Sequence, residues 1–494
     1  MSFNSYIFLF CFLPLCLLGW YGLNKYGKYN MALGFLTLMS LWFYGYFNPS
    51  YLLIMVASVS VNYFLSFLMD RSEKFNKVFM VTGALFNLGL LFYYKYYDFF
   101  IENVNAVFKT DYNLKHILLP LGISFFTFQQ FSFIIERGRK KIPHCGPAEY
   151  AAFVTFFPQL VAGPIVLYEE MIPQFRDKAR RSFNADNMYN GIGYFVMGLA
   201  KKVLLADVLA IPVNYGFDNS IYMDAVGTVL VMTAYTLQLY FDFSGYSDMA
   251  IGLGLMFNLE LPVNFKSPYK SSTLKELWER WHMTLTRFLR NYVYIPLGGN
   301  RKGKARKLFN IFAVFVVSGI WHGASWNYII WGILTGIIVI WNNLNIFGYD
   351  KNASNPAKIV LPEFIGRIIT PITFAFLLIP FRSPDIATIW VLLRNLTKGW
   401  TGNAYKIANV IKLPEMYIIE EILQKVAPSY TNMFALGVFI LLCALGIFIC
   451  SRKNTAQIVN AYREKRWFMP VCVLLLVYCI ISFSQVSTFI YFNF

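Results

Sequence analysis

Long apolar stretches recur along this chain, and they constrain its fold more than any other feature. Of its 494 residues, 57% are hydrophobic and 14% are charged, whereas soluble domains average about 25% charged residues. A membrane-spanning helix needs roughly 20 apolar residues, and about a dozen stretches are candidates. Residues 6–20 lack the basic region and cleavage site of a signal peptide, so we interpret them as the first span. We therefore predict an all-α, polytopic membrane protein.

The net charge of +17 is concentrated in short loops. Nucleic-acid binding is one explanation of a basic protein, but a polytopic chain keeps its basic loops in the cytoplasm. The loops after the first, third and fifth spans are basic, as at 137–141. Both chain termini are therefore predicted on the extracytoplasmic side of a bacterial cell membrane. The predicted spans are residues 6–20, 31–47, 51–69, 78–94, 117–135, 308–319, 327–344, 365–379, 433–450 and 468–483.

Three segments between these spans have their own character. Residues 95–115 are predicted as a mixed-charge loop. Residues 264–307 are long, basic and aromatic, and they should face the cytoplasm. Residues 382–432 mix acidic and basic side chains and are expected outside, with some amphipathic helix.

Two further apolar regions are interrupted by polar residues. Residues 191–215 contain Lys201-Lys202, and residues 228–256 contain Asp242 and Asp248. Non-helical backbone at membrane depth survives only when it is buried in protein or lines a wet cavity. We therefore expect two broken helices around a cavity. The aspartates either position a catalytic group or substrate, or cap the broken helix.

His322 is the candidate catalytic residue. The chain has four histidines, and His322 is the one within a long apolar region. Titratable side chains at membrane depth are costly and usually functional. An apolar setting keeps the imidazole neutral, and a neutral imidazole is a competent general base. The alternative is a core histidine bonded to a backbone carbonyl.

The basic segment contains two weaker candidates. His282 follows a Trp-Glu-Arg-Trp run in an amphipathic, basic setting, which predicts a surface histidine on an interfacial helix. Gly298-Gly299 precedes a basic run that ends near Lys304. Backbone N–H groups and cationic side chains there suit phosphates, although a plain cytoplasmic turn has the same composition.

The cysteines and histidines give no indication of a metal site. The seven cysteines include no Cys-x-x-Cys spacing, and most lie in apolar runs, where free cysteine behaves as a small hydrophobe. No nucleophile elbow or Cys/His pair is visible. We predict no bound metal and no bound cofactor.

Several sequence blocks together resemble the membrane-bound O-acyltransferase (MBOAT) family, specifically its bacterial alginate O-acetyltransferase-like branch. The resemblance covers nearly the whole chain. The blocks are LYFDFSGYSDMA at 239–250, a block from Asn264-Phe265 through WERWH at 278–282 to YIPLGGNR at 294–301, and SGIWHG at 318–323, with weaker matches of PLGISFFTF at 120–128 and FPQLVAGP at 157–164.

This resemblance implies a fold and a division of the chain. It implies a ring of about 11–13 tilted transmembrane helices around a thin centre, with a cytoplasmic and an extracytoplasmic funnel. Residues 1–494 would form a single membrane domain. Residues 1–135 would supply N-terminal spans, residues 136–346 a catalytic core containing the 264–307 segment, and residues 347–494 the C-terminal spans and an extracytoplasmic tail.

The resemblance also implies a reaction. His322 matches the family's catalytic histidine, and the ending FIYFNF at 489–494 matches a family ending whose tyrosine, here Tyr491, is a candidate acyl carrier. The expected donor is a cytoplasmic thioester, acetyl-CoA or an acyl-carrier protein. The expected acceptor is an extracytoplasmic polysaccharide such as alginate, reached through an SGNH-hydrolase-like partner. Membrane lipid surrounds the protein.

The remaining site predictions concern the donor and the tunnel, with Asp242 in a positioning role. The predicted donor-binding residues are Lys266, Arg280, His282, Arg287, Arg290, Gly298, Gly299 and Arg301. The predicted tunnel-lining residues are Gln238, Ser244, Trp321, Trp326 and Asn327.

The chain departs from the family pattern at two positions, and two other functions remain as alternatives. The chain has Asn291 where relatives have Asp, and Leu167 where they often have Arg. D-alanyl transfer to teichoic acid is one alternative. A transporter or channel with His322 as a gate is another, because broken spans suit transporters, although no inverted repeat is visible.

Overall fold

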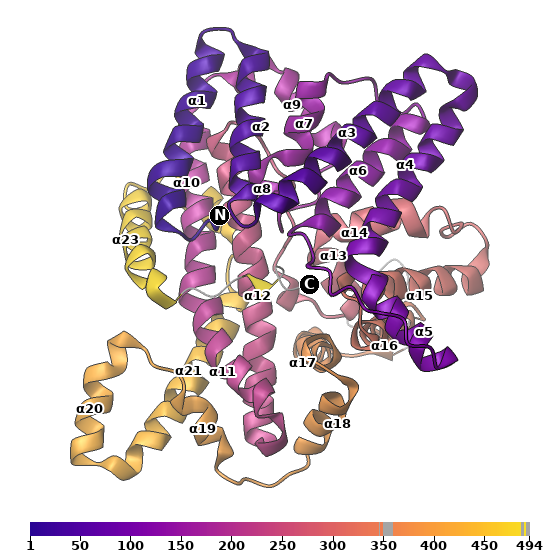
Figure 1. Cartoon of the computed structure of the whole chain (residues 1–494). Coiled ribbons are helices and arrows are strands. Elements are labelled where there is room, and N and C mark those ends of the chain that lie inside the picture. Colours follow the sequence, from indigo (N-terminus) through magenta and orange to yellow (C-terminus); the bar gives the residue numbers. More distant parts are fainter. Residues whose placement is uncertain (345, 349–358, 486–488, 491–494) are drawn as a thin grey trace.

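The computed structural model describes residues 1–344, 346–348, 359–485 and 489–490, and most of these are helical (Figure 1). Two-residue strands β1 (Phe347–Gly348) and β2 (Ile359–Val360) form a parallel pair. The first helices are α1 (Leu13–Lys25), α2 (Tyr29–Gly45), α3 (Pro49–Arg71), α4 (Asn76–Leu91), α5 (Tyr97–Phe108) and α6 (Ile123–Gly138).

The middle of the chain contains the longest helix, α12, which is largely buried and lies at the centre of Figure 1. The middle helices are α7 (Pro147–Thr155), α8 (Phe157–Leu160), α9 (Tyr168–Arg176), α10 (Ala185–Ala200), α11 (Asp207–Asp218), α12 (Ala225–Met256), α13 (Leu274–Arg280), α14 (Met283–Leu289), α15 (Gly303–His322) and α16 (Trp326–Asn343).

The last helices follow the strand pair. They are α17 (Glu363–Arg382), α18 (Ile386–Asn395), α19 (Asn403–Asn409), α20 (Tyr417–Val426), α21 (Thr431–Ser451), α22 (Thr455–Tyr462) and α23 (Phe468–Ile481). π-Helical segments occur at Phe8–Phe12, Phe92–Tyr96, Lys201–Ala206 and Arg290–Tyr294. Short 3₁₀ turns occur at Glu73–Phe75, Lys178–Arg181, Ser220–Tyr222, Pro268–Lys270, Pro414–Met416, Pro428–Tyr430 and Ser482–Gln485.

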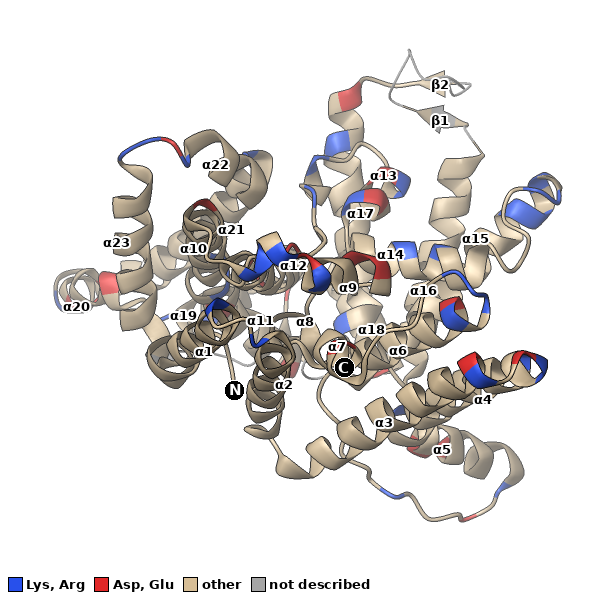
Figure 2. Ribbon diagram, turned by 90° about the horizontal axis from the view of Figure 1, so that it is seen from above, with Lys and Arg blue, Asp and Glu red and all other residues tan. Residues whose placement is uncertain are grey.

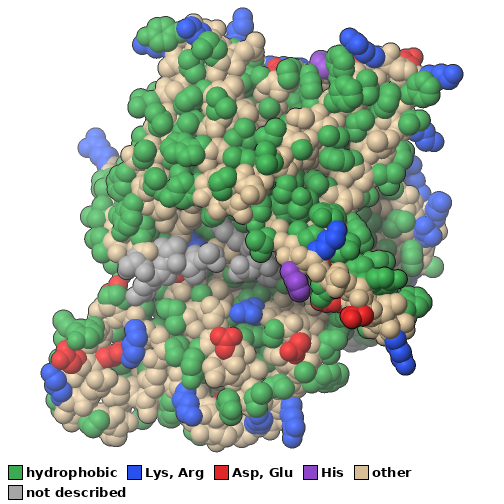
Figure 3. Space-filling model, viewed as in Figure 1, with side chains coloured by type: hydrophobic (Ala, Val, Ile, Leu, Met, Phe, Trp, Pro, Cys, Tyr) green, Lys and Arg blue, Asp and Glu red, His purple; other side chains and the backbone are tan. Residues whose placement is uncertain are grey.

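The surface of the molecule is that of a membrane protein. Hydrophobic side chains cover most of the upper part of the face in Figure 3, with lysines and arginines along its top edge. Seen from above, charged residues lie mainly at helix ends and in loops (Figure 2). Five helical stretches among the described residues are long and apolar enough to cross a membrane: Phe8–Lys25, Pro49–Arg71, Glu73–Phe108, Glu363–Arg382 and Pro428–Ser451. The prediction of a polytopic helical membrane protein is confirmed, whereas a ring of 11–13 spans stays a prediction.

The two predicted helix breaks are wrong. Helix α12 runs without interruption through Asp242 and Asp248, and Lys201-Lys202 begin a π-helical segment that joins α10 to α11. The reason is that the two polar regions pair with each other. Lys201 Nζ lies 2.5 Å from Asp248, and Lys202 Nζ lies 2.7 Å from Asp242. The two carboxylates pair with lysines of the neighbouring segment, so they do not need backbone N–H groups of α12, and its backbone stays helical.

The predicted loop at 95–115 is also wrong in part, because α5 occupies Tyr97–Phe108. The helix has a strong apolar side that the mixed charges obscure in a count of residues. The amphipathic helix expected within residues 382–432 is present as α20, whose charged residues pair with neighbours, as in the contact of Glu420 with Lys412.

Close contact between α10 and α12 depends on two pairs of glycines. A Cβ atom on Gly198 would lie 2.5 Å from the carbonyl oxygen of Gly245, and one on Gly191 would lie 2.6 Å from that of Gly252. Small residues let helix backbones approach closely in membranes, where dispersion and hydrogen bonds drive helix association. The glycines therefore bring the π-helical segment within reach of the aspartates on α12.

Substitution of Gly245 by Ala should destabilise the protein. The new Cβ would lie 2.8 Å from Gly198 O, and overpacking of this kind costs about 1–3 kcal/mol. Gly437→Ala is the matched control, because nothing lies within 4 Å of its Cβ position in α21. Thermal unfolding in detergent measures both variants. Equal melting temperatures for the two would contradict the close-contact interpretation.

Candidate active site

His322 is the last residue of α15, and its position depends on a lysine from a distant helix. Lys95 donates hydrogen bonds to the carbonyl oxygens of Trp321 at 2.6 Å and His322 at 3.1 Å. The last carbonyls of a helix lack partners within the helix, and a cation there also suits the helix dipole. Tyr96 adds a hydrogen bond to Ile320 O at 2.8 Å. The π-helical segment Phe92–Tyr96 therefore fixes the end of α15.

The imidazole of His322 is enclosed by aromatic side chains. Its side chain is 5% exposed. The ring centroids of Trp321, Trp331 and Phe381 lie 4.8, 5.1 and 5.1 Å from the His322 ring. This burial agrees with the predicted place of His322 inside the apolar body.

His282 is a second buried histidine, and the prediction of a surface position for it is wrong. The residue is 2% exposed and precedes α14 in a left-handed conformation, with φ of 45°. That conformation is unfavourable for a residue with a side chain and is often found at functional sites. The charged run before it occupies α13, and the left-handed turn directs the chain inward at His282. The ring packs edge-on against Phe243, 4.7 Å between centroids.

An asparagine defines the hydrogen-bonding state of His282. Asn264 Oδ1 lies 3.1 Å from His282 Nδ1 and also accepts a hydrogen bond from the Thr284 hydroxyl at 3.0 Å. With the amide oriented this way, Oδ1 only accepts, so Nδ1 of a neutral His282 carries the proton. The lone pair is then on Nε2. The chain around Asn264 is held by backbone bonds, including Met283 N to Asn264 O.

The two histidines line one cavity of about 60 Å³ between α13, α14 and α15. The other lining residues are Trp278, Trp281, Leu285, Thr286, Leu289, Val314, Phe315 and Ser318. The cavity is largely apolar, with two imidazoles and two hydroxyl groups. Such an arrangement is able to bind a small apolar group, such as an acetyl group, beside two groups that exchange protons.

Asp242 lies in a different part of the core, within a buried cluster of charges. Lys202 Nζ lies between Asp207, at 2.8 Å, and Asp242, at 2.7 Å, and all three side chains are almost fully buried. The cluster has one ammonium for two carboxylates among the described residues. Excess buried negative charge is stabilised by additional N–H donors. The proposed helix-capping role of Asp242 is ruled out by the continuous α12.

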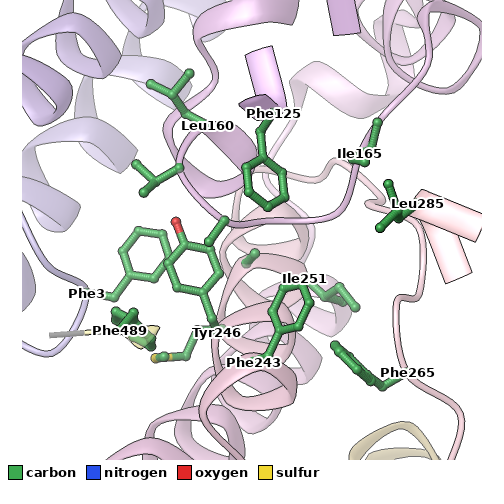
Figure 4. Packing of buried hydrophobic residues seen from close by; sticks show 14 of the residues in the cluster. Phe3, Phe125, Leu160, Ile165, Phe243, Tyr246, Ile251, Phe265, Leu285 and Phe489 are labelled. Carbon is green, nitrogen blue, oxygen red and sulfur yellow. The ribbon is translucent and has the colours of Figure 1, made fainter. Parts of the chain in front are cut away.

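The C-terminal tail supplies such a donor. Ile490 N–H donates to Asp242 Oδ2 at 2.9 Å. Phe489 is 2% exposed; its ring lies below the Lys202 ammonium at 4.4 Å and packs edge-on against Tyr246 at 4.9 Å. Figure 4 shows Phe489, Tyr246 and Phe3 together on one side of α12, with Phe243 on another. The next residue, Tyr491, lies outside the described residues.

The predicted donor-binding residues do not form one cluster. Arg287 pairs with Glu170, and Arg280 pairs with Glu276, so both guanidinium groups already have carboxylate partners. Lys266, Arg290 and Arg301 are exposed, and Gly298 and Gly299 have φ of 105° and 55° in the turn that follows Arg290–Tyr294.

The predicted tunnel-lining residues also separate. Gln238, Ser244, Trp321 and Asn327 are buried, but they do not line the cavity shared by the histidines. Asn327 donates to Ser383 O at 2.7 Å. Trp326 is 52% exposed, and its indole N–H donates to Asn103 at 3.0 Å.

Both positions that depart from the family pattern line one cavity. Leu167 and Asn291 lie on a cavity of about 230 Å³ between the end of α6, the start of α9 and the π-helical segment after α14. Arg139, Lys141 and Glu136 also line it, and Glu136 pairs with both cations. The departures from the family pattern at positions 167 and 291 therefore both alter the lining of this cavity.

Sequence reasoning missed Lys95, Asn264 and the burial of His282. The only sequence signal for Lys95 is a lone cation after a long apolar run. Asn264 begins the block that resembles the family, which is a signal for its importance but not for its contact with His282. Both contacts join residues that are far apart in the chain or separated by a turn.

Comparisons with known proteins match this chain to a family of membrane-bound enzymes. The model of the MBOAT, membrane-bound O-acyltransferase family, matches residues 116–361. A peptidoglycan O-acetyltransferase of Helicobacter pylori is 35% identical over 100% of this chain and 98% of the relative. A probable alginate O-acetylase of Pseudomonas aeruginosa is 36% identical over 79% of this chain and 74% of the relative. A teichoic acid D-alanyltransferase of Streptococcus thermophilus is 30% identical over 46% of this chain and 58% of the relative.

The described residues form a polytopic helical membrane protein with two buried histidines that line one cavity. The chain belongs to the membrane-bound O-acyltransferase family. It is therefore an enzyme that transfers acyl groups to hydroxyl groups.

Substitution of Lys95 by Met should destabilise the end of α15. It removes the donor to two carbonyl groups, and each buried acceptor left without a partner costs about 1–3 kcal/mol. Lys95→Arg should recover part of the loss, because a guanidinium group also donates. Lys77→Met, an exposed change in α4, is the control and should stay within about 0.5 kcal/mol of the parent. Thermal unfolding in detergent distinguishes the variants, and a stable Lys95→Met protein would contradict the capping role.

Proposed function

We propose that the enzyme transfers an acetyl group from a cytoplasmic thioester, acetyl-CoA, to hydroxyl groups of an extracytoplasmic polysaccharide. The observation that carries this proposal is the cavity lined by both His282 and His322. Part of its lining, from Trp278 to Leu289, belongs to the basic segment 264–307, which the charge distribution predicts to be cytoplasmic. The donor would approach from that side, with its thioester in the cavity and its phosphates near the exposed cations of the segment.

The proposed chemistry needs one base and one attacking hydroxyl. His322 accepts the hydroxyl proton as the oxygen forms a bond to the thioester carbonyl carbon. The carbon–sulfur bond then breaks, and the imidazolium returns the proton to the departing thiolate. General-base assistance of this kind contributes about 10²–10⁴-fold to a rate. The aromatic walls around His322 keep water, a competing nucleophile, out of the site.

His282 is proposed as the second proton-handling group of the cavity. Asn264 holds its Nδ1–H, which leaves Nε2 as an acceptor. An acceptor in that place is suited to orient either the attacking hydroxyl or the departing thiol. Asn264 is a positioning residue in this proposal, because it acts through His282.

The relatives favour acetyl transfer to a glycan. The peptidoglycan O-acetyltransferase aligns with the whole chain, and the alginate O-acetylase aligns with 79% of it. The D-alanyltransferase aligns with less than half. Peptidoglycan is therefore the first acceptor to test and alginate-type exopolysaccharide the second, each through an extracytoplasmic SGNH-hydrolase-like partner. D-alanyl transfer from a carrier protein is the competing donor chemistry.

The C-terminal tail is proposed to carry the acetyl group outward. Ile490 and Phe489, which precede Tyr491 in the chain, contact the buried Lys202–Asp242 pair. The Tyr491 hydroxyl would attack the thioester, and the resulting acetyl ester would be passed to the partner. This step needs no additional reactant besides the thioester.

Replacement of His322 by Ala should reduce acetyl transfer by at least about 10²-fold, because the base is lost. His144→Gln is the control, since His144 is an exposed histidine paired with Asp70, and its activity should stay near that of the parent. The measurement is transfer of radiolabelled acetyl from acetyl-CoA by purified protein with its partner. Full activity of His322→Ala would exclude its role as base. If the protein transferred D-alanine but not acetyl, the proposed acetyl donor would be wrong and a D-alanyl donor would take its place.

Replacement of Tyr491 by Phe should abolish labelling of the enzyme by acetyl-CoA while binding of the donor persists, because the accepting hydroxyl is lost. Ile490→Pro should weaken labelling strongly, since proline lacks the N–H that binds Asp242, whereas Ile490→Val keeps it. Mass spectrometry of the C-terminal peptide measures the acetyl ester. Direct transfer to the glycan by Tyr491→Phe would contradict the carrier step and leave His322 as the base.

A further inference from the structure

A large, open groove lies on α12, away from the histidines. Its volume is about 740 Å³. Helices α17 and α21 form its two walls, and both belong to stretches able to cross a membrane. The lining residues are Thr233, Thr236, Leu237, Tyr269, Lys270, Arg367, Ile368, Pro371, Ile372, Ala375, Ile447, Cys450 and Ser451.

The two ends of the groove differ in character. Arg367 lies near the start of α17 and Ser451 is the last residue of α21, so both mark the same end of the groove, together with Lys270. Ile372 and Ala375 lie further along α17, and the exposed Ile368 and Ile447 add apolar surface to the walls. The groove therefore combines a cationic end with an apolar body.

The cationic end is open to a ligand. Arg367 donates to Glu363 at 2.7 Å, but both side chains are more than half exposed, so the pair is weak, and guanidinium retains further donors. Lys270 has no ion-pair partner in the part of the chain that the structure describes. The Tyr269 hydroxyl is used in a 2.7 Å bond to Thr236 O.

We propose that this groove binds one anionic phospholipid of the membrane, with its headgroup phosphate between Lys270 and Arg367 and an acyl chain along α12. Basic pockets between transmembrane helices on the cytoplasmic side favour anionic headgroups. Each cation near such a headgroup contributes roughly a fivefold gain in affinity. The acetyl donor has no long hydrocarbon chain, so the apolar walls suit a lipid better. The bound lipid would hold α17 and α21 together across the groove.

The test measures lipid retention and does not depend on acetyl transfer. Full-length protein is reconstituted in vesicles of phosphatidylcholine with phosphatidylglycerol, extracted, and examined by native mass spectrometry. Phosphatidylglycerol should be retained over phosphatidylcholine, and Lys270→Gln with Arg367→Gln should reduce the preference by more than fivefold. Ala375→Phe, which fills the body of the groove, should reduce retention of phosphatidylglycerol while keeping both cations.

Lys275→Gln is the matched control. Lys275 is exposed on α13 and does not line the groove, so its substitution should leave retention unchanged. Size-exclusion elution and melting temperature confirm that each variant is folded. Equal retention of the two lipids, or an unchanged preference in the double variant, would overturn the proposal. Displacement of the lipid by a long-chain acyl-CoA would assign the groove to a different occupant and would overturn it as well.

Discussion

The pairing of two lysines with two aspartates inside the helical body supports the rest of this structure. Hydrocarbon offers no partner to a charged group, so each must be satisfied within the protein. Lys201 and Lys202 meet Asp248 and Asp242 across the contact between α10 and α12. Buried pairs gain little net stability but are costly to break. They therefore fix the relative register of the π-helical segment and α12. Tyr246 of α12 in turn packs against Phe3, near the N-terminus, and Phe489, near the C-terminus.

The candidate active site is built at the ends of helices. His322 ends α15 and His282 precedes α14. Helix ends leave backbone groups without partners, and side chains from elsewhere supply them: Lys95 for α15 and Asn264 for the turn before α14. The two histidines are thus held rigidly by surrounding structure, as a site that must orient a small acyl group requires.

Aromatic side chains separate the histidine cavity from the proposed lipid groove. Trp278 and Trp281 line the cavity, and Tyr269 lines the groove. Between them, Phe374 lies 5.8 Å from Trp278, 5.1 Å from Trp281 and 6.0 Å from Tyr269, between ring centroids. If the two proposals hold, this partition keeps a lipid chain in the groove apart from an acyl group in the histidine cavity.

The sequence by itself determined the helical membrane class, the acyltransferase family and the burial of His322, because hydropathy and family blocks are local properties of the chain. It did not determine the continuity of α12, the burial of His282 or the role of Lys95. Those depend on contacts between residues up to 227 positions apart, as for Lys95 and His322. In a sequence, a charged residue within an apolar run suggests an interrupted helix. A buried partner of opposite charge allows the helix to continue, and only the tertiary structure identifies that partner.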